Sequence, residues 1–494
     1  MSRTEAAEAC AKDLIVTGQL GALRSCGLKR GAGRTPEIPV FDPYTGERLG
    51  AVPCASAEEV RQAVDWAMAY PAKLTRHQRA SVLEGCARKV RERMEPIARL
   101  ISAESGLSIH DARYEVGRVC SVLGFGAQEV LRDDGQTFSC DLGVPTRARK
   151  VFTQRFPLQG VIAAITPFNH PMNQVAHKVV PSIASNNRMV LKPSEKVPFS
   201  AMLLADLLYE AGLPEPMLQI LAGEPGEVVD ALLAHPDVEM ITFTGGVAVG
   251  KAIAQRAGYR KLVLELGGND PLIVMDDADL EEASTLAVLG SYRNSGQRCT
   301  AIKRMLVHAS IAEDFTARLV EKTRAFACGD PMLESNQMGT VIDEGAAKRI
   351  AERVEEAIAQ GAQLLHGHLR EGALYAPTVL DRVRPEMRVV REETFGPVSP
   401  IIRFRTVHEA IAIANSTAYG LSSAVCTNRL SDIDRFVHGL HVGTVNVREV
   451  PGYRLEVTPF GGIKDSGLGY KEGVQEAIRS FTHLKTYSLP WGEA

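Results

Sequence analysis

The sequence lacks the patterns that mark several classes of protein. No apolar run approaches the roughly 20 residues of a membrane-spanning helix, and the first residues contain no apolar core of a secretory signal. The nine cysteines form no CxxC pair and no Cys/His spacing typical of a zinc site. The formal charge is only −3, so nothing points to nucleic acid or an anionic membrane as a partner. These absences predict a cytoplasmic protein without a metal site.

From residue 160 onward, short apolar runs alternate with helical segments. The runs GVIAAI (160–165) and NRMVLKP (187–193) are predicted strands, and VEMITFT and KLVLEL follow them with helices between. A second alternating series begins near residue 271 with PLIVM and continues through RMLVH, SPIIRF, SSAVCT and GTVNV. Strands alternating with helices of this length predict parallel βαβ units in open sheets. At 494 residues, we expect two α/β domains.

Residues that suit catalysis or binding follow several of these predicted strands. Open parallel sheets bind ligands beyond the carboxyl ends of their strands. The stretches TPFNHP, KPSE, FTGG and ELGGND each come directly after a strand, and Cys299 follows a predicted helix of the second series. The run GGVAVG departs from the GxGxxG fingerprint, so the glycines alone are weak support for a dinucleotide.

Seven motifs together resemble the NAD(P)-dependent aldehyde dehydrogenase superfamily over nearly the whole chain. They are TPFNHP, KPSE, FTGG, ELGGND, GQRC, EETFGPV and PFGGIKDSG, in the order usual for that family. The resemblance implies two Rossmann-type open parallel-sheet domains, a small oligomerisation hairpin and a homodimer or homotetramer. It implies an NAD-binding domain over 1–138 and 159–270, a catalytic domain over 271–475, and oligomerisation or bridging segments over 139–158 and 476–494.

Aldehyde oxidation explains the residue types at four of these positions. A thiolate is the strongest nucleophile available near neutral pH, so Cys299 would attack the aldehyde carbon. The resulting oxyanion needs preorganised donors, which by resemblance are the Asn169 amide and the Cys299 backbone N–H. Glu265 would activate the water that hydrolyses the thioester. Lys178 matches a family position that relays protons or fixes Asn169.

The resemblance also implies the cofactor contacts and favours NAD. Lys192 and Glu195 match the adenosine-ribose contacts, where a carboxylate accepts from the ribose hydroxyls and repels a 2′-phosphate. Glu393 and Phe395 match the nicotinamide-ribose and ring contacts. Gly246 stands where the family often has serine, which removes one expected hydrogen bond to the pyrophosphate. The remaining predicted cofactor residues are Thr166, Pro167, Phe168, Gly226, Phe243, Thr244, Gly245 and Leu266.

Arg298, directly before Cys299, has two possible roles. A nearby cation lowers a thiol pKa, and a guanidinium fork also binds oxyanions. Because consecutive side chains diverge, we expect Arg298 to point into the substrate channel and bind an anionic aldehyde. The surrounding sequence resembles the phosphonoacetaldehyde dehydrogenases, which form phosphonoacetate during aminoethylphosphonate breakdown. By that resemblance the predicted substrate residues are Arg118, His170, Arg298, Thr300 and Arg448, with Arg454 as an alternative to Arg448.

Three other functions remain open from the sequence. Succinate semialdehyde or sulfoacetaldehyde could replace the phosphonate substrate, since either carries an anionic group. Coenzyme A could accept the acyl group, although Glu265 argues for water. A binding protein that kept the fold without catalysis is disfavoured by Asn169, Glu265, Cys299 and Glu393 together.

Overall fold

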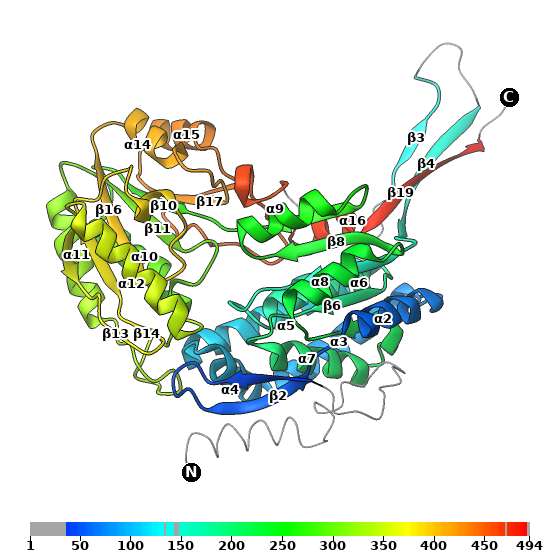
Figure 1. Ribbon diagram of the computed structural model, residues 1–494. Coiled ribbons are helices and arrows are strands. Elements are labelled where there is room, and N and C mark those ends of the chain that lie inside the picture. The colour runs from blue at the N-terminus through cyan, green and yellow to red at the C-terminus, as the bar shows by residue number, and fades with distance from the viewer. Residues whose placement is uncertain (1–35, 133–134, 143–147, 470–471, 492–494) are drawn as a thin grey trace.

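The computed structural model describes residues 36–132, 135–142, 148–469 and 472–491. Two α/β lobes lie side by side, and a narrow antiparallel sheet projects from one of them (Figure 1). Within the described part of the chain, no helix combines the length and apolar character needed to cross a bilayer.

The first lobe is built on a five-stranded parallel sheet of order β7-β6-β5-β8-β9. Its strands are β5 (Val161–Ile165), β6 (Met189–Lys192), β7 (Leu218–Ile220), β8 (Val238–Thr244) and β9 (Lys261–Glu265). The connecting helices are α6 (Asn173–Ala184), α7 (Pro198–Glu210), α8 (Pro225–Ala234) and α9 (Val247–Arg256), with the short 3₁₀ turn η1 (Glu215–Met217). The strands and helices predicted between residues 160 and 265 are confirmed.

Both faces of this sheet are buried, which explains the continuous apolar runs of its strands. Alternate residues of β5 point to opposite sides, so Ile162 and Ala164 belong to one apolar core while Val161 and Ala163 belong to another. The chain before the sheet supplies covering helices and a hairpin. These are β1 (Glu37–Phe41), β2 (Arg48–Pro53), α2 (Ala57–Ala69), α3 (Arg76–Glu92), α4 (Met94–Ser105) and α5 (Ile109–Leu131).

The second lobe contains a seven-stranded sheet of order β12-β15-β16-β11-β10-β17-β18. Only the pairing of β12 with β15 is antiparallel among its described strand pairs. The strands are β10 (Asp270–Val274), β11 (Ile302–His308), β12 (Gln363–His366), β15 (Thr378–Asp381), β16 (Val398–Phe404), β17 (Ser422–Cys426) and β18 (Thr444–Val447). The other elements are α10 (Leu280–Tyr292), η2 (Arg293–Gly296), α11 (Ala312–Ala325), α12 (Glu344–Ala359), β13 (Arg370–Glu371), β14 (Leu374–Tyr375), α13 (Arg388–Arg391), α14 (Val407–Asn415), α15 (Leu430–Gly439) and η3 (Lys464–Ser466).

The projecting sheet joins two distant segments of the chain. It pairs β3 (Thr137–Ser139) and β4 (Arg149–Pro157) with the C-terminal β19 (Thr482–Pro490), as Figure 1 shows. Just before β19, α16 (Val474–Ser480) packs against α5 and α6 of the first lobe. Residues 474 and 475, which we expected in the catalytic domain, therefore lie on the first lobe, because Val474 is part of its apolar core.

Two sheet edges meet between the lobes. The chain passes from β9 directly to β10, so the carboxyl edge of the first sheet lies against the amino edge of the second. The first sheet reverses its strand order between β5 and β8, and such a switch point is where open sheets bind ligands.

Candidate active site

The turn before Cys299 holds three consecutive residues with left-handed backbone. Asn294, Ser295 and Gly296 have φ values of 59°, 54° and 68°, a conformation that costs free energy for residues other than glycine. Hydrogen bonds hold the turn in place: the Asn294 N–H donates to Asp111 Oδ2 at 2.7 Å, and Asn294 Nδ2 donates to the Asn169 carbonyl at 2.7 Å. The turn that precedes Cys299 is thus held in place by hydrogen bonds to Asp111 and to Asn169.

Asn169 lies against the same turn. Its Nδ2 donates to the Gln297 carbonyl at 2.8 Å. An amide nitrogen carries two N–H groups, so one N–H stays available for an oxyanion formed at Cys299. The sequence-predicted pair of nucleophile and oxyanion donor is therefore brought together.

Burial raises the pKa of the Cys299 thiol to about 11, and among the cations Lys303 lowers it most, followed by Arg454. The Lys303 Nζ donates to the carbonyls of Arg298 and Cys299, each at 2.7 Å. The cation that chiefly favours the thiolate is therefore Lys303, on β11, and not the neighbouring Arg298.

Glu265 ends β9 and approaches Cys299 through the two glycines that follow it. A Cβ at Gly268 would lie 2.3 Å from the Cys299 carbonyl oxygen, and one at Gly267 would lie 2.3 Å from a Glu393 carboxylate oxygen. At Gly268 only glycine allows the two backbones to come so close. The residues GG of the ELGGND motif thus join the two sheet edges.

The Glu265 carboxylate is buried, and neither oxygen has a hydrogen-bond partner among the described residues. Burial raises the pKa of Glu265 well above its usual value, and the charge of Glu472 raises it further, while Lys178 and Arg454 oppose the shift. Lys178 itself donates to Glu472 at 2.9 Å. Lys178 therefore acts on Glu265 as a nearby charge, since its ammonium is bonded to Glu472.

An inner cavity of about 360 Å³ lies at the switch point of the first sheet. Eight of the predicted cofactor residues line it: Pro167, Phe168, Thr244, Gly245, Gly246, Leu266, Glu393 and Phe395. The rings of Phe168 and Phe395 are 5.9 Å apart, edge to face. The Glu393 carboxylate accepts from the Gly268 N–H at 3.1 Å and lies 3.4 Å from the Lys303 Nζ.

This cavity suits a dinucleotide. Gly246 precedes the first residue of α9 and provides no side-chain cap, so the first N–H groups of the helix can bind a pyrophosphate. The hydroxyl of Thr244, which lines this cavity, is buried and has no hydrogen-bond partner among the described residues, so it can bind a ligand. A nicotinamide dinucleotide would be held there by these groups together with Glu393.

Five predicted cofactor residues lie at the same sheet edge but outside the cavity lining. They are Thr166, Lys192, Glu195, Gly226 and Phe243. The Lys192 Nζ donates to Glu195 Oε2 at 3.0 Å, so the two side chains predicted at the adenosine ribose are joined by an ion pair.

An outer cavity of about 370 Å³ opens on the other side of Cys299. Four arginines line it, namely Arg118, Arg293, Arg298 and Arg454, together with His170 and Thr300. Cys299 and Gln174 line both cavities, so the thiol lies where a substrate in one would meet a dinucleotide in the other.

The Arg298 guanidinium lies against the C-terminal end of α10. Its Nη2 donates to the carbonyls of Gly290 at 2.7 Å and Leu289 at 3.2 Å, while its buried Nε has no partner among the described residues. Burial, and then the charge of Arg293, lower the pKa of Arg298 to about 10. The Arg298 guanidinium is therefore still positively charged near neutral pH, and its Nε–H is available to donate to an anion.

Arg118 and His170 each have a buried glutamate as neighbour. The Arg118 Nε donates to Glu456 Oε1, and His170 Nδ1 lies 3.5 Å from Glu115 Oε2. Burial lowers the pKa of His170, with Arg118 and Arg298 adding to the shift and Glu115 opposing it. His170 is therefore a neutral hydrogen-bonding group in this cavity, whereas Arg118 is a cation.

Arg448 does not line the outer cavity. Its guanidinium pairs with Glu282 at 2.8 Å and donates to Asn428 at 2.9 Å. Glu282 is in the first turn of α10, at the far end of the helix from Arg298. The expectation that Arg448 binds substrate is therefore corrected. Arg448 follows the carboxyl end of β18, whereas Cys299 precedes the amino end of β11. The loop after Arg448 returns toward Cys299, so that Arg454 lines the cavity instead.

Several cavity residues were missed from the sequence. Arg293 begins the turn that leads to Cys299 and donates to Asp111 Oδ1 at 3.0 Å; its place in the same loop as the nucleophile could have indicated it. Arg349 and Arg353 line the inner cavity, and their i, i+4 spacing on α12 places them on one helix face.

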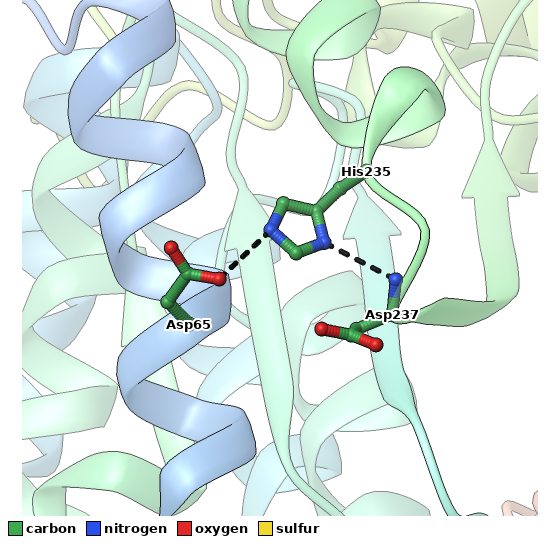
Figure 2. Close-up of side chains that lie close together, drawn as sticks. All are labelled: Asp65, His235 and Asp237. Atoms are coloured by element: carbon green, nitrogen blue, oxygen red, sulfur yellow. Dashed lines mark hydrogen bonds and ion pairs between the residues drawn. The ribbon is translucent and has the colours of Figure 1, made fainter.

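One cluster elsewhere has the composition of a metal site. Asp65 on α2, His235 after α8 and Asp237 lie close together, as Figure 2 shows. The His235 Nδ1 accepts from the Asp237 backbone N–H at 3.2 Å, and its Nε2 lies 3.2 Å from Asp65 Oδ1. Since both ring nitrogens are engaged, the imidazole has no lone pair left for an ion, and the cluster instead ties α2 to the loop before β8.

Comparison with known proteins shows the family to which the chain is similar. The family model described as "Aldehyde dehydrogenase family" matches residues 30–487. The chain is 42% identical to a sulfoacetaldehyde dehydrogenase of Neptuniibacter caesariensis, over 90% of this chain and 98% of the relative. It is 39% identical to an aspartate-semialdehyde dehydrogenase of Pseudomonas canavaninivorans, over 92% and 97%. The structure resembles the NADP-dependent glyceraldehyde-3-phosphate dehydrogenase of Bacillus halodurans, with a TM-score of 0.89 and 37% identity over 92% and 96% of the two chains.

The chain belongs to the aldehyde dehydrogenase family. It is an NAD(P)-dependent enzyme that oxidises a small aldehyde, and the predicted fold class is confirmed.

Proposed function

We propose that the enzyme oxidises phosphonoacetaldehyde to phosphonoacetate with NAD, in aminoethylphosphonate degradation. The observation that carries this proposal is the set of four arginines around the cavity that opens on Cys299. Guanidinium groups are the side chains best suited to a tetrahedral oxyanion, because their donors form a fixed fork. A phosphonate presents three oxygens, enough for contacts with Arg118, Arg298 and Arg454 at once.

The reaction follows from the residues around the thiol. The Cys299 thiolate attacks the aldehyde carbon, and the Asn169 amide and the Cys299 N–H stabilise the oxyanion of the thiohemiacetal. A nicotinamide dinucleotide held in the inner cavity, beside Glu393 and Phe395, would supply the hydride acceptor. Glu265 then takes a proton from the water that hydrolyses the thioester, a role that suits a carboxylate with both oxygens unpaired. Lys178 and Glu472 set the charge around Glu265.

NAD is the cofactor that we propose, because of Glu195. This residue is at the sheet edge where the adenosine ribose would lie, and a carboxylate there repels the 2′-phosphate of NADP. Lys192 is ion-paired with it, so the lysine is not free to bind that phosphate.

Sulfoacetaldehyde is the second candidate, and two observations favour it. A relative with 42% identity is a sulfoacetaldehyde dehydrogenase. In addition, Arg118 and Arg293 are each paired with a carboxylate at hydrogen-bond distance, which reduces the positive charge left for a dianion. A sulfonate has the shape of a phosphonate with a single negative charge.

The test is NADH formation by the purified enzyme with phosphonoacetaldehyde, sulfoacetaldehyde, succinate semialdehyde and propanal. A kcat/KM for phosphonoacetaldehyde at least about a hundredfold above the others, which is roughly 2.7 kcal/mol of differential transition-state binding, supports the first proposal. A kcat/KM that is highest for sulfoacetaldehyde supports the second candidate. Equal kcat/KM values for all four aldehydes, or the highest value for propanal, would refute both.

We also propose that the chain forms a homodimer or homotetramer through the projecting sheet. Leu484, Tyr487, Leu489 and Trp491 are exposed there, and light scattering of the purified protein measures the assembly directly.

A further inference from the structure

The glutamate behind Arg118 is a feature that the reaction described above does not use. Glu456 is buried, with 6% of its surface exposed. Its Oε1 accepts from the Arg118 Nε, and its Oε2 lies 2.7 Å from His177 Nε2. Burial acts to raise the pKa of Glu456, but His177, then Arg118 and Arg454, hold that pKa far below its usual range. Glu456 is thus a fixed negative charge behind the wall of the outer cavity.

The other arginines of this cavity show why that charge matters. Arg293 is paired with Asp111, whereas Arg298 has no carboxylate partner among the described residues. The carboxylate nearest to Arg454 is 3.8 Å away, on Glu472, and that glutamate already accepts from Lys178. The net charge that a substrate meets, to which Asp111 and Glu449 of the cavity lining also contribute, therefore depends in part on whether Arg118 is neutralised from behind.

Glu456 is also separable from the catalytic groups. Asp111 holds the backbone of Asn294 in the nucleophile turn, and Glu472 acts on Glu265. The side-chain hydrogen bonds of Glu456 among the described residues, by contrast, go to Arg118, on α5, and His177, on α6. A change in its charge alters the substrate cavity without changing a hydrogen bond of Cys299, Asn169 or Glu265.

We propose that Glu456 tunes specificity by charge: paired with Arg118, it lowers the preference of the cavity for an aldehyde with two negative charges relative to an isosteric aldehyde with one. This inference rests on the proposed function, because it concerns anionic aldehydes. Glu456 need not touch the substrate. It acts by cancelling most of the field of a cation that does, and buried charges of opposite sign at hydrogen-bond distance cancel effectively at longer range.

Two substrates of nearly equal shape isolate this effect. Sulfoacetaldehyde is a monoanion, and phosphonoacetaldehyde is mainly a dianion at about pH 8, well above the second pKa of a phosphate-like group. The measured quantity is the ratio of kcat/KM for the phosphonate to that for the sulfonate. A loss of packing lowers both values together and leaves the ratio unchanged.

Glu456→Gln keeps the size of the side chain and removes its charge. We expect the ratio to rise about tenfold, which is 1.4 kcal/mol, because Arg118 then presents a full positive charge. Arg118→Gln removes the cation and keeps the charge of Glu456, which His177 still contacts, so the ratio should fall about tenfold. The double variant removes both charges and should return to within about threefold of the wild-type ratio. Glu456→Asp retains the charge and is the matched control, with an unchanged ratio.

The proposal is overturned if Glu456→Gln and Arg118→Gln move the ratio in the same direction, or if neither moves it. Should Glu456→Gln fail to fold, judged by thermal unfolding, Arg118→Gln and the double variant still decide the matter. Failure of the proposed function is a distinct result: the wild-type enzyme would then oxidise propanal as efficiently as either anionic aldehyde.

Discussion

Arg298→Ala is the substitution that best separates substrate binding from thiol activation. The side chain has a buried Nε without a partner among the described residues, and it lines the cavity beside Cys299. One charge-assisted hydrogen bond contributes about 1.5–3 kcal/mol, which corresponds to a loss of about ten- to 150-fold. We expect that loss in KM for the preferred anionic aldehyde and little change for propanal, measured by steady-state NADH formation.

The thiol provides a second, independent measurement. Because Lys303 is the cation that lowers the Cys299 pKa most, the pH dependence of Cys299 alkylation should be nearly the same in Arg298→Ala and the wild-type enzyme. Arg448→Ala is the matched control, since Arg448 binds the other end of α10 and should leave both aldehydes unaffected. Equal losses on propanal and the anionic aldehyde, or an alkylation profile moved to higher pH, would show that Arg298 serves the thiol.

Three further substitutions test the base and the cofactor site. Glu265→Gln should release about one NADH per site in a rapid burst and then stall, because hydride transfer precedes hydrolysis of the thioester; stopped-flow absorbance showing steady turnover without a burst would contradict this. Glu472→Gln should move the acidic limb of the hydrolysis profile to lower pH: the charge of Glu472 raises the Glu265 pKa, the base works only when deprotonated, and its removal lowers that pKa. A limb that stays in place or moves to higher pH refutes the coupling. Glu195→Gln should raise kcat/KM for NADP relative to NAD, and an unchanged ratio would remove Glu195 as the discriminating group.

The sheets were predictable because their signal is local. Buried parallel strands are continuous apolar runs. Each strand predicted from such a run, from GVIAAI (β5) to GTVNV (β18), is a strand of one of the two sheets. The motif residues at the ends of β5, β8 and β9 follow from the same logic. Cys299 differs, since it precedes β11 and lies at the amino edge of its sheet. The family motifs indicated its role, whereas strand-end reasoning alone would not.

The outer cavity was harder to predict because its residues come from distant loops. Arg448 and Arg454 are six residues apart in one irregular segment, and no periodicity tells which of them turns toward Cys299. The pairing of Arg118 with Glu456 joins residues 338 positions apart. Charges that neutralise each other across such a separation leave no pattern in the sequence, so the net charge of the cavity had to come from the structure.

The meeting of the two cavities at Cys299 and Gln174 has a consequence for how such enzymes diversify. Among their lining residues, the outer and inner cavities share only Cys299 and Gln174. Mutations that change the substrate can therefore accumulate in the arginine-lined outer cavity, while the residues of the inner cavity stay unchanged. A gene duplicate of this enzyme would begin with working chemistry and would need only a new outer wall.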